Sequence, residues 1–163
     1  MNNWHQSQRG FFAGALYEEM EKDDSIVLLT GDLGYGMFDK IKEKFPTRFI
    51  NTGAAEQALL GIAVGLAQEN KKPFCYTITS FFLRAAETIS LYLDHENAAV
   101  RLVGSGVGQD YEHDGYSHDC TKAQEFLHSC HLMEYLPETK EQIPDMVKRM
   151  VEKEEASFIG LRR

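Results

Sequence analysis

Several features that mark common protein classes are scarce or absent in this sequence. It has three cysteines, four prolines and one tryptophan in 163 residues, and no apolar run approaches the roughly 20 residues that cross a bilayer. The N-terminus lacks a basic segment followed by an apolar one, so no signal peptide is expected. Cys75, Cys120 and Cys130 form an odd set without close pairing, which argues against a disulfide framework. These absences favour a cytoplasmic protein without a membrane segment.

Positive charge is also in short supply. The chain carries 17 Lys and Arg against 25 Asp and Glu, for a formal net charge of −8. A nucleic-acid-binding surface needs clustered basic residues, so no nucleic-acid partner is expected. Hydrophobic residues make up 43% and charged residues 26%, which is typical of a globular protein. The length fits a single domain, residues 1–163, with a substantial core.

Short apolar runs alternate with amphipathic stretches along the chain. Strands are expected at 26–30, 48–51, 74–78, 99–103, 132–135 and 157–161. Helices are expected at 9–22, 37–45, 55–69, 83–95, 123–130 and 140–153. Because strands and helices alternate through short loops, the predicted fold class is α/β, with a mostly parallel sheet and helices on both of its faces.

The stretch 51–67 combines a tight turn with an apolar helix. Small residues at 53–55 permit a sharp strand-to-helix turn, and Gly61 and Gly65 leave a bare stripe where another backbone can approach. Glu56 is the exception, a carboxylate in the first turn of an otherwise apolar helix. It could simply complement the helix dipole from solvent, or it could have a chemical role.

The same stretch resembles the pyrimidine-binding domain of transketolase-like thiamine diphosphate enzymes, whose motif reads G-x-A-E-Q-x-x-x-G-x-A-x-G-L-A. The matching residues are Gly53, Ala55, Glu56, Gln57, Gly61, Ala63, Gly65, Leu66 and Ala67. In that family the motif Glu bonds the aminopyrimidine ring nitrogen and promotes the tautomer that activates the thiazolium carbon. The resemblance assigns this catalytic and cofactor-binding role to Glu56. The order of expected strands and helices extends the resemblance along nearly the whole chain.

Two adjacent aromatic residues, Phe81 and Phe82, follow the predicted strand 74–78. Aromatic residues at a strand-to-helix junction are commonly core residues, but a Phe face can also stack on a flat heteroaromatic ring. The segment 81–89 resembles the F-F-x-R-A-x-[DE]-x-I run of some transketolases. This implies that Phe81 stacks on the cofactor ring, with Phe82 as the alternative. Arg84 then lies at the edge of the pyrimidine pocket, where some family members have Tyr.

Asp32 follows the first predicted strand in a glycine-rich loop. An Asp at such a place often only forms a turn or caps a helix. Ligands of open parallel sheets bind beyond the carboxyl ends of the strands, so Asp32 is also placed to reach a ligand. In the family an Asp-Leu pair here lies close to the cofactor and the partner subunit, which implies a secondary cofactor-binding role for Asp32.

The loop 108–120 concentrates polar side chains that could suggest a metal site. His113, Asp114, His118 and Cys120 are close in sequence, but their spacing matches no zinc pattern and no second pair of ligands follows. No metal site is therefore predicted on this chain.

Residues 114–118 of this loop instead resemble the D-G-P-[TS]-H segment of the family, whose His faces the substrate side of the cofactor. The resemblance implies that His118 assists proton transfer or binds substrate oxygens, which suits an imidazole. His113 is the second candidate for contact with substrate. Tyr116 replaces the Pro of the segment and Asp119 stands where transketolases often have Gln, so substrate choice could differ from transketolase.

The sequence has no counterpart of the diphosphate and magnesium site, which in this superfamily lies on another domain marked by G-D-G and a later Asn. Residues 31–34 imitate it poorly, and no suitable Asn follows. The resemblance therefore implies thiamine diphosphate as cofactor, Mg²⁺ expected on a partner, and a separate diphosphate-binding subunit in an α2β2 assembly.

The reaction implied by the resemblance is transfer of a two-carbon ketol unit between sugar phosphates. Two other enzymes stay open: a subunit of a 2-oxoacid dehydrogenase acting on a keto substrate, and an enzyme similar to 1-deoxyxylulose-5-phosphate synthase. A non-catalytic orphan domain that scaffolds a partner is the alternative from another class. The presence together of Glu56, Phe81 and His118 argues against it.

Overall fold

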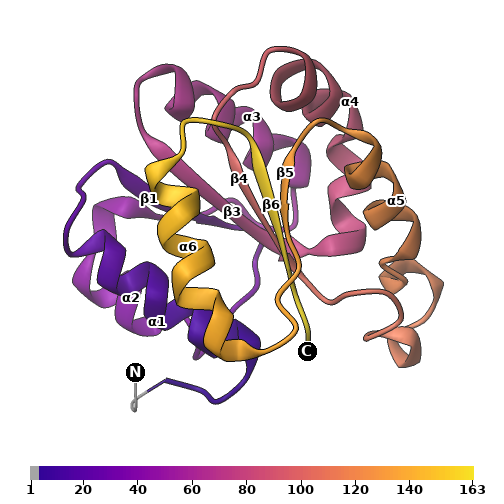
Figure 1. Ribbon diagram of the computed structural model, residues 1–163, viewed down its shortest axis with the longest axis horizontal. Coiled ribbons are helices and arrows are strands. Elements are labelled where there is room, and N and C mark those ends of the chain that lie inside the picture. Colours follow the sequence, from indigo (N-terminus) through magenta and orange to yellow (C-terminus); the bar gives the residue numbers. More distant parts are fainter. Residues whose placement is uncertain (1–3) are drawn as a thin grey trace.

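Six parallel strands form one sheet at the centre of the molecule (Figure 1). The computed structural model describes residues 4–163. The strands are β1 (Ile26–Thr30), β2 (Phe49–Asn51), β3 (Lys72–Ile78), β4 (Arg101–Ser105), β5 (Met133–Tyr135) and β6 (Ser157–Leu161). Their order across the sheet is β2-β1-β3-β4-β6-β5, and every pair is parallel. The predicted fold class is confirmed.

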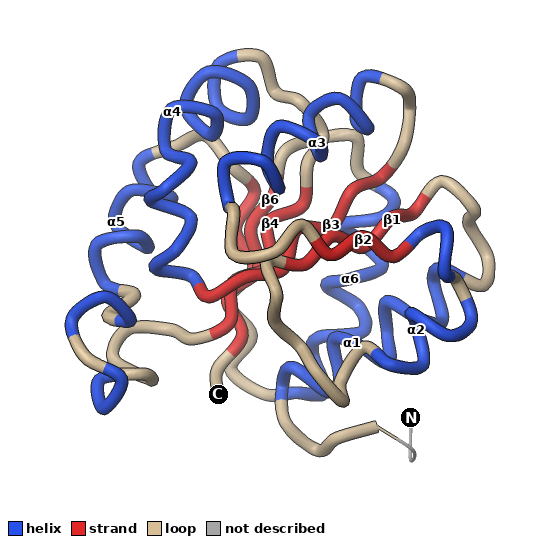
Figure 2. Tube along the Cα trace, turned by 180° about the vertical axis from the view of Figure 1, so that it is seen from behind, coloured by secondary structure: helices blue, strands red, loops and turns tan. Residues whose placement is uncertain are grey.

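Helices cover both faces of this sheet, as Figure 2 shows from behind. Residues of α1 (Gln8–Met20), α2 (Asp39–Lys44) and α6 (Ile143–Glu152) share one hydrophobic cluster on the first face. The second cluster contains residues of α3 (Glu56–Gln68), of the segment after β3, and of α5 (Thr121–Ser129). The sheet is therefore the middle of three layers.

Strand β1 shows why the central strands read as continuous apolar runs. Ile26 and Leu28 pack into the cluster under α1, whereas Val27 and Leu29 pack into the cluster under α3. Successive side chains of a strand point to opposite faces, so a strand covered on both faces needs an apolar residue at every position.

The predicted helix 83–95 is not one α-helix. The structure has a 3-10 helix η2 (Thr79–Ala85), the short α4 (Ala86–Thr88) and a π-helical segment η3 (Ile89–His95). Phe82, Ala85, Ile89 and Leu93 are all buried on the same cluster. The buried face therefore continues from η2 into η3 although the helix type changes. This is a change in helix type that an apolar pattern does not reveal.

The strands expected at 26–30 and 157–161 are found with the same bounds, and the other predicted elements have shifted ends. Strand 99–103 begins two residues later, at Arg101. The expected helix 140–153 divides into a 3-10 turn η6 (Lys140–Gln142) and α6. Short 3-10 helices also occur before β2, at η1 (Pro46–Arg48), and in the polar loop, at η4 (Glu112–Asp114) and η5 (Tyr116–His118).

The strand order reverses between β1 and β3. The chain leaves β1 towards β2 on one side, and it leaves β3 towards β4 on the other. The loops after β1 and β3 therefore diverge, and such a switch point at the carboxyl edge is where open parallel sheets bind ligands.

Candidate functional site

The first group at this edge is built around Glu56, the first residue of α3. Its side chain is only 1% exposed, although Glu is rarely buried without a partner. Oε2 accepts a hydrogen bond from Nη1 of Arg84 at 2.8 Å, and Oε1 accepts a longer one from the hydroxyl of Thr77 on β3, at 3.4 Å. The carboxylate is thus held under the start of α3, where the helix dipole also favours negative charge.

An open cleft of about 580 Å³ leads to this carboxylate. Ala54, Ala55, Glu56, Gln57, Ala58 and Arg84 line it, and we call it the carboxylate cleft. The small side chains before α3 leave the backbone accessible from solvent. The sequence motif therefore produces a buried acid at the bottom of an accessible surface depression.

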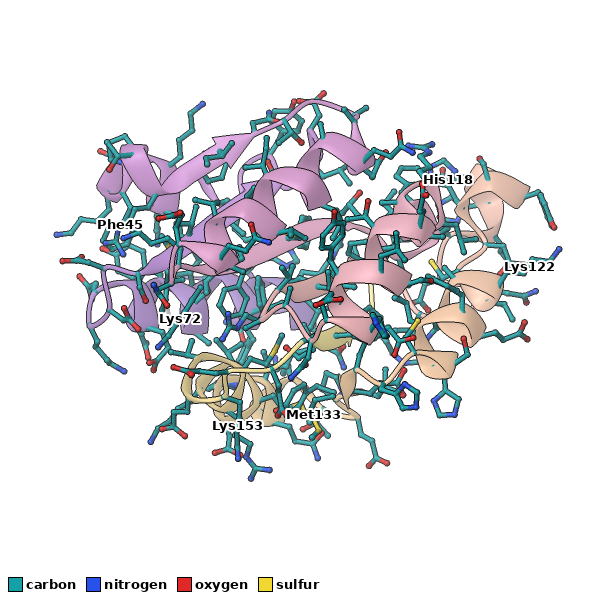
Figure 3. All side chains as sticks on the ribbon, turned by 90° about the horizontal axis from the view of Figure 1, so that it is seen from above. Phe45, Lys72, His118, Lys122, Met133 and Lys153 are labelled. Carbon is teal, nitrogen blue, oxygen red and sulfur yellow. The ribbon has the colours of Figure 1, made fainter. Side chains whose placement is uncertain are left out.

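Phe81 and His118 lie beside one another near Arg84. The guanidinium of Arg84 lies over the Phe81 ring, 4.0 Å from its centroid. The imidazole of His118 meets the same ring edge-on, with 5.1 Å between centroids. His118 lies at one end of the molecule, close to the start of α5, where Lys122 is labelled in Figure 3. The structure thus brings together four residues singled out in the sequence: Glu56, Phe81, Arg84 and His118.

The loop carrying His118 is fastened to η2. The hydroxyl of Ser80 donates to the carbonyl of Ser117 at 2.9 Å, and the hydroxyl of Ser117 bonds Nδ1 of His118 at 3.0 Å. Because Ser80 immediately precedes Phe81, one short segment positions both the Phe81 ring and the His118 imidazole.

Phe82 does not belong to this group. It is fully buried and meets the ring of Phe158, in β6, at nearly a right angle. A strand-to-helix junction turns neighbouring side chains in different directions, and here the second Phe fills the core. The structure therefore places Phe82 in the core, apart from the group formed by Glu56, Phe81, Arg84 and His118.

Asp32 and His113 make other contacts. Asp32 is exposed, accepts hydrogen bonds from Asn51 and Tyr35, and has a positive φ of 60°. Both hydrogen bonds lower the pKa of Asp32. His113 contacts Arg163, at the end of the chain, and Asp114. Neither Asp32 nor His113 forms a hydrogen bond or an ion pair with Glu56, Phe81 or His118.

A second cleft, of about 620 Å³, opens at the same edge on the α1 face. We call it the arginine cleft; it is lined by His5, Ser7, Arg9, Leu33, Gly34, Tyr35, Gly36, Met37, Tyr76, Ile78, Ser105 and Tyr111. Arg9 Nη1 donates to the phenol oxygen of Tyr111 at 3.2 Å, and that oxygen lies 2.7 Å from the hydroxyl of Ser105. Among the residues described, Nε of Arg9 is buried without a hydrogen-bond partner.

Sequence reasoning missed the arginine cleft. Its polar residues come from α1 and the segment before it, from the loop after β1, and from β3, β4 and the loop after β4, so no local motif contains them. Only Ser105, the last residue of β4, could have indicated this cleft from the sequence. Residues at the carboxyl ends of parallel strands commonly face ligands. Burial raises the pKa of the Tyr76 phenol, which lines this cleft.

Tyr111 lies between the two groups. Its ring centroid is 6.4 Å from that of His118, and its hydroxyl joins Arg9 to Ser105. Gly106, at φ 90°, makes room for it, since a Cβ there would come within 2.5 Å of the Tyr111 ring. The loop after β4 thus links the arginine cleft to the imidazole near Phe81.

Two other kinds of feature are not found in residues 4–163. No group of three or more His, Cys, Asp or Glu side chains is arranged to hold a metal ion in this part of the chain. None of its helices is both long enough and apolar enough to cross a membrane.

An open parallel α/β sheet with a buried acid and a stacked aromatic ring at its switch point defines a ligand-binding α/β domain. Residues 6–163 match the family model described as the transketolase, pyrimidine binding domain. The chain belongs to this family.

Its relatives are longer proteins. The chain is 33% identical over 112 residues to a 6-deoxy-6-sulfo-D-fructose transketolase subunit of Clostridium sp. (strain MSTE9), covering 68% of this chain and 35% of that protein. It is 37% identical over 111 residues to transketolase of Homo sapiens, covering 67% of this chain and 18% of the human protein.

Solved structures show the same fold. A split-gene transketolase, described as an inactive β4 tetramer, superposes with a TM-score of 0.85 at 28% identity, over 98% of this chain and 52% of that one. Transketolase from Leishmania mexicana superposes with a TM-score of 0.80 at 16% identity, over 96% of this chain and 25% of that one. The chain thus spans about half or less of the proteins to which it is similar.

Proposed function

We propose that this chain, as a single pyrimidine-binding domain, is one part of a split, thiamine diphosphate-dependent, transketolase-like transferase. It would transfer a two-carbon ketol unit between sugar phosphates together with a separate diphosphate-binding subunit. The observation that carries the proposal is that Arg84 pairs with the buried Glu56 carboxylate and also lies over the half-buried ring of Phe81, which brings the acid and the aromatic ring to one place.

The residues of the carboxylate cleft fit the pyrimidine half of this cofactor. An aminopyrimidine is a flat ring with a basic nitrogen, and a buried carboxylate with an aromatic face nearby offers it one hydrogen-bonding and one stacking partner. Glu56 would exchange a proton with the ring nitrogen, and Phe81 would fix the ring. When bound, thiamine diphosphate supplies the carbanion chemistry that cleaves a carbon–carbon bond next to a carbonyl.

His118 and the arginine cleft suit the substrate. The imidazole of His118, held by Ser117 against Phe81, can move a proton on a substrate hydroxyl. Arg9 offers a buried N–H without a partner, and a guanidinium is well suited to bind phosphate. The arginine cleft therefore supports a phosphorylated sugar as the substrate class. His113, in η4 and in contact with Arg163, would meet the same substrate from the outside.

An exposed apolar surface supports a partner subunit. Ile62, Leu83 and Leu91 are more than 40% exposed, and nothing lies within 4 Å of a Cβ placed at Gly61 or Gly65. This surface adjoins the carboxylate cleft through α3 and η2. The partner would bind here, carry Mg²⁺ and the diphosphate, and form an α2β2 heteromer, with Asp32 near the interface. The three buried free cysteines suit the cytoplasm.

Calorimetric titration tests the proposal. Thiamine diphosphate with Mg²⁺ is titrated into the chain alone and into the chain mixed with a candidate subunit that carries G-D-G and the later Asn. We expect at most weak binding to the chain alone, through the pyrimidine half of the cofactor, and tight binding to the mixture. Tight binding to the chain alone would contradict the assignment of the diphosphate site to a partner.

A further inference from the structure

One side chain, Arg84, makes both contacts that a pyrimidine ring would make in the carboxylate cleft. Its Nη1 donates to Oε2 of Glu56 at 2.8 Å, and its guanidinium carbon lies 4.0 Å from the centroid of the Phe81 ring. A guanidinium is planar, carries its N–H donors in that plane and stacks on aromatic faces. An aminopyrimidine offers a carboxylate and a Phe ring the same combination of polar edge and flat face.

The two members of the ion pair differ strongly in burial. The side chain of Glu56 is 1% exposed, whereas that of Arg84 is 51% exposed. A carboxylate removed from water needs a partner, because an unpaired buried charge is costly. The other oxygen of Glu56 has only the 3.4 Å contact with Thr77. Arg84 reaches Glu56 from the surface and can return to water, so it is the movable member of the pair.

We infer that Arg84 is a place-holder for the pyrimidine ring: it pairs with Glu56 and covers Phe81 in the empty chain, and it leaves when the ring binds. This inference rests on the proposed function, because it takes Glu56 and Phe81 as the ring-binding pair. It differs from a permanent cofactor-binding role for Arg84, in which the guanidinium and the ring would be bound together.

If Arg84 is a place-holder, Arg84→Met should lower stability but strengthen ring binding. This substitution keeps roughly the length of the side chain and removes its charge. The empty chain loses the partner of a buried carboxylate, and we expect its melting temperature to fall by about 3–8 °C. Ring binding no longer has to break an ion pair, and we expect it to become at least about tenfold tighter, the effect of one ordinary charge-assisted hydrogen bond. If Arg84 were instead a permanent ligand of the ring, Arg84→Met would bind the ring more weakly.

The test uses 4-amino-5-hydroxymethyl-2-methylpyrimidine, the pyrimidine half of the cofactor, as the probe. It is titrated into the full chain, into Arg84→Met and into Arg84→Lys, which keeps the charge but loses the planar group. Binding is followed by amide and arginine side-chain NMR signals, and melting by circular dichroism. Arg149→Met is the matched control, because Arg149 pairs with Asp145 at 2.8 Å on the exposed side of α6.

The expected result is a less stable Arg84→Met chain that binds the probe at least about tenfold more tightly than the wild type, including the case in which only the variant binds. The side-chain signal of Arg84 should shift in the wild type as the probe saturates. Equal or weaker binding by Arg84→Met, no binding by either chain, or an unchanged Arg84 signal at saturation would overturn the inference.

A second titration separates failure of this inference from failure of the proposed function. Thiamine diphosphate with Mg²⁺ is added to the reconstituted complex carrying Glu56→Gln or Phe81→Ala. If these variants lose cofactor affinity while Arg84→Met gains none for the probe, only the place-holder is wrong. If both bind the cofactor as the wild type does, the ring-binding pair is wrong, and both proposals fail with it.

Discussion

The two clefts at the carboxyl edge of the sheet differ in how their charged groups are partnered. In the carboxylate cleft the buried charge is the acid, Glu56, and a cation satisfies it at 2.8 Å. In the arginine cleft the charged group is Arg9, whose buried Nε has no hydrogen-bond partner among the residues described. Its neighbours Tyr76, Ser105 and Tyr111 carry hydroxyls and no negative charge.

This difference indicates that the clefts are prepared for ligand groups of opposite character. The carboxylate cleft has its partner already and must exchange it for a ligand group that donates a hydrogen bond. The arginine cleft has a donor in excess and can accept an anion without losing an internal bond. Under the proposed function, the carboxylate cleft takes the cofactor ring and the arginine cleft takes the phosphate of a substrate, so the two roles are separable by mutation.

Removal of the acid should produce the largest effect. Glu56→Gln keeps the shape of the side chain, and its amide oxygen can still accept from Arg84, so folding should be nearly unchanged. We expect turnover of the reconstituted enzyme to fall by about 10²–10⁴-fold, the usual contribution of a positioned acid or base, with little change in KM for the sugar phosphate. Steady-state kinetics measure this. Glu69→Gln, at the exposed end of α3, is the control, and near-normal turnover of the Glu56 variant would remove the acid from the mechanism.

The next effect tests the imidazole of His118, which lies beside Phe81. His118→Ala should lower turnover by about 100-fold through the loss of a proton-transferring group, while leaving cofactor affinity within about twofold. Calorimetry and kinetics on the same preparation separate the two. His128→Ala, in which an exposed His paired with Glu134 is lost, is the control. Loss of cofactor affinity without a defect in turnover would place His118 in the carboxylate cleft instead.

The carboxylate cleft and the arginine cleft were not equally predictable from sequence. Glu56, Phe81 and Arg84 lie within 29 consecutive positions and belong to runs with a fixed spacing, so a local pattern identifies them. Arg9 and Tyr111 are 102 positions apart and meet only in the folded chain, where α1 packs on the face of the sheet that contains Val103 of β4. Phe82 shows that a local pattern can also be insufficient. The apolar pattern places two Phe residues at the junction but does not indicate which of them faces the core.

Arg9 should control substrate affinity. Arg9→Met removes the unpaired donor of the arginine cleft, and we expect KM for a phosphorylated sugar to rise by about 10–100-fold, the value of a hydrogen bond to a charged group. Turnover at saturation and the KM for the unphosphorylated sugar should change little. The comparison of these two substrates is the measurement, with Arg149→Met as the control. An equal loss for both substrates would mean that the cleft does not bind the phosphate.

Tyr111 should give the smallest effect, and it tests whether the clefts are coupled. Tyr111→Phe keeps the ring near His118 and removes only the hydroxyl that joins Arg9 to Ser105. We expect a loss of about 1 kcal/mol in the free energy of unfolding and a rise of a few-fold in KM for the sugar phosphate, because Arg9 is less well oriented. In a double-mutant cycle with Arg9→Met the two effects on KM should not add, since residues in one hydrogen-bond network act together. Full additivity would show that Tyr111 and Arg9 act on the substrate independently, and that the hydroxyl does not connect the two clefts.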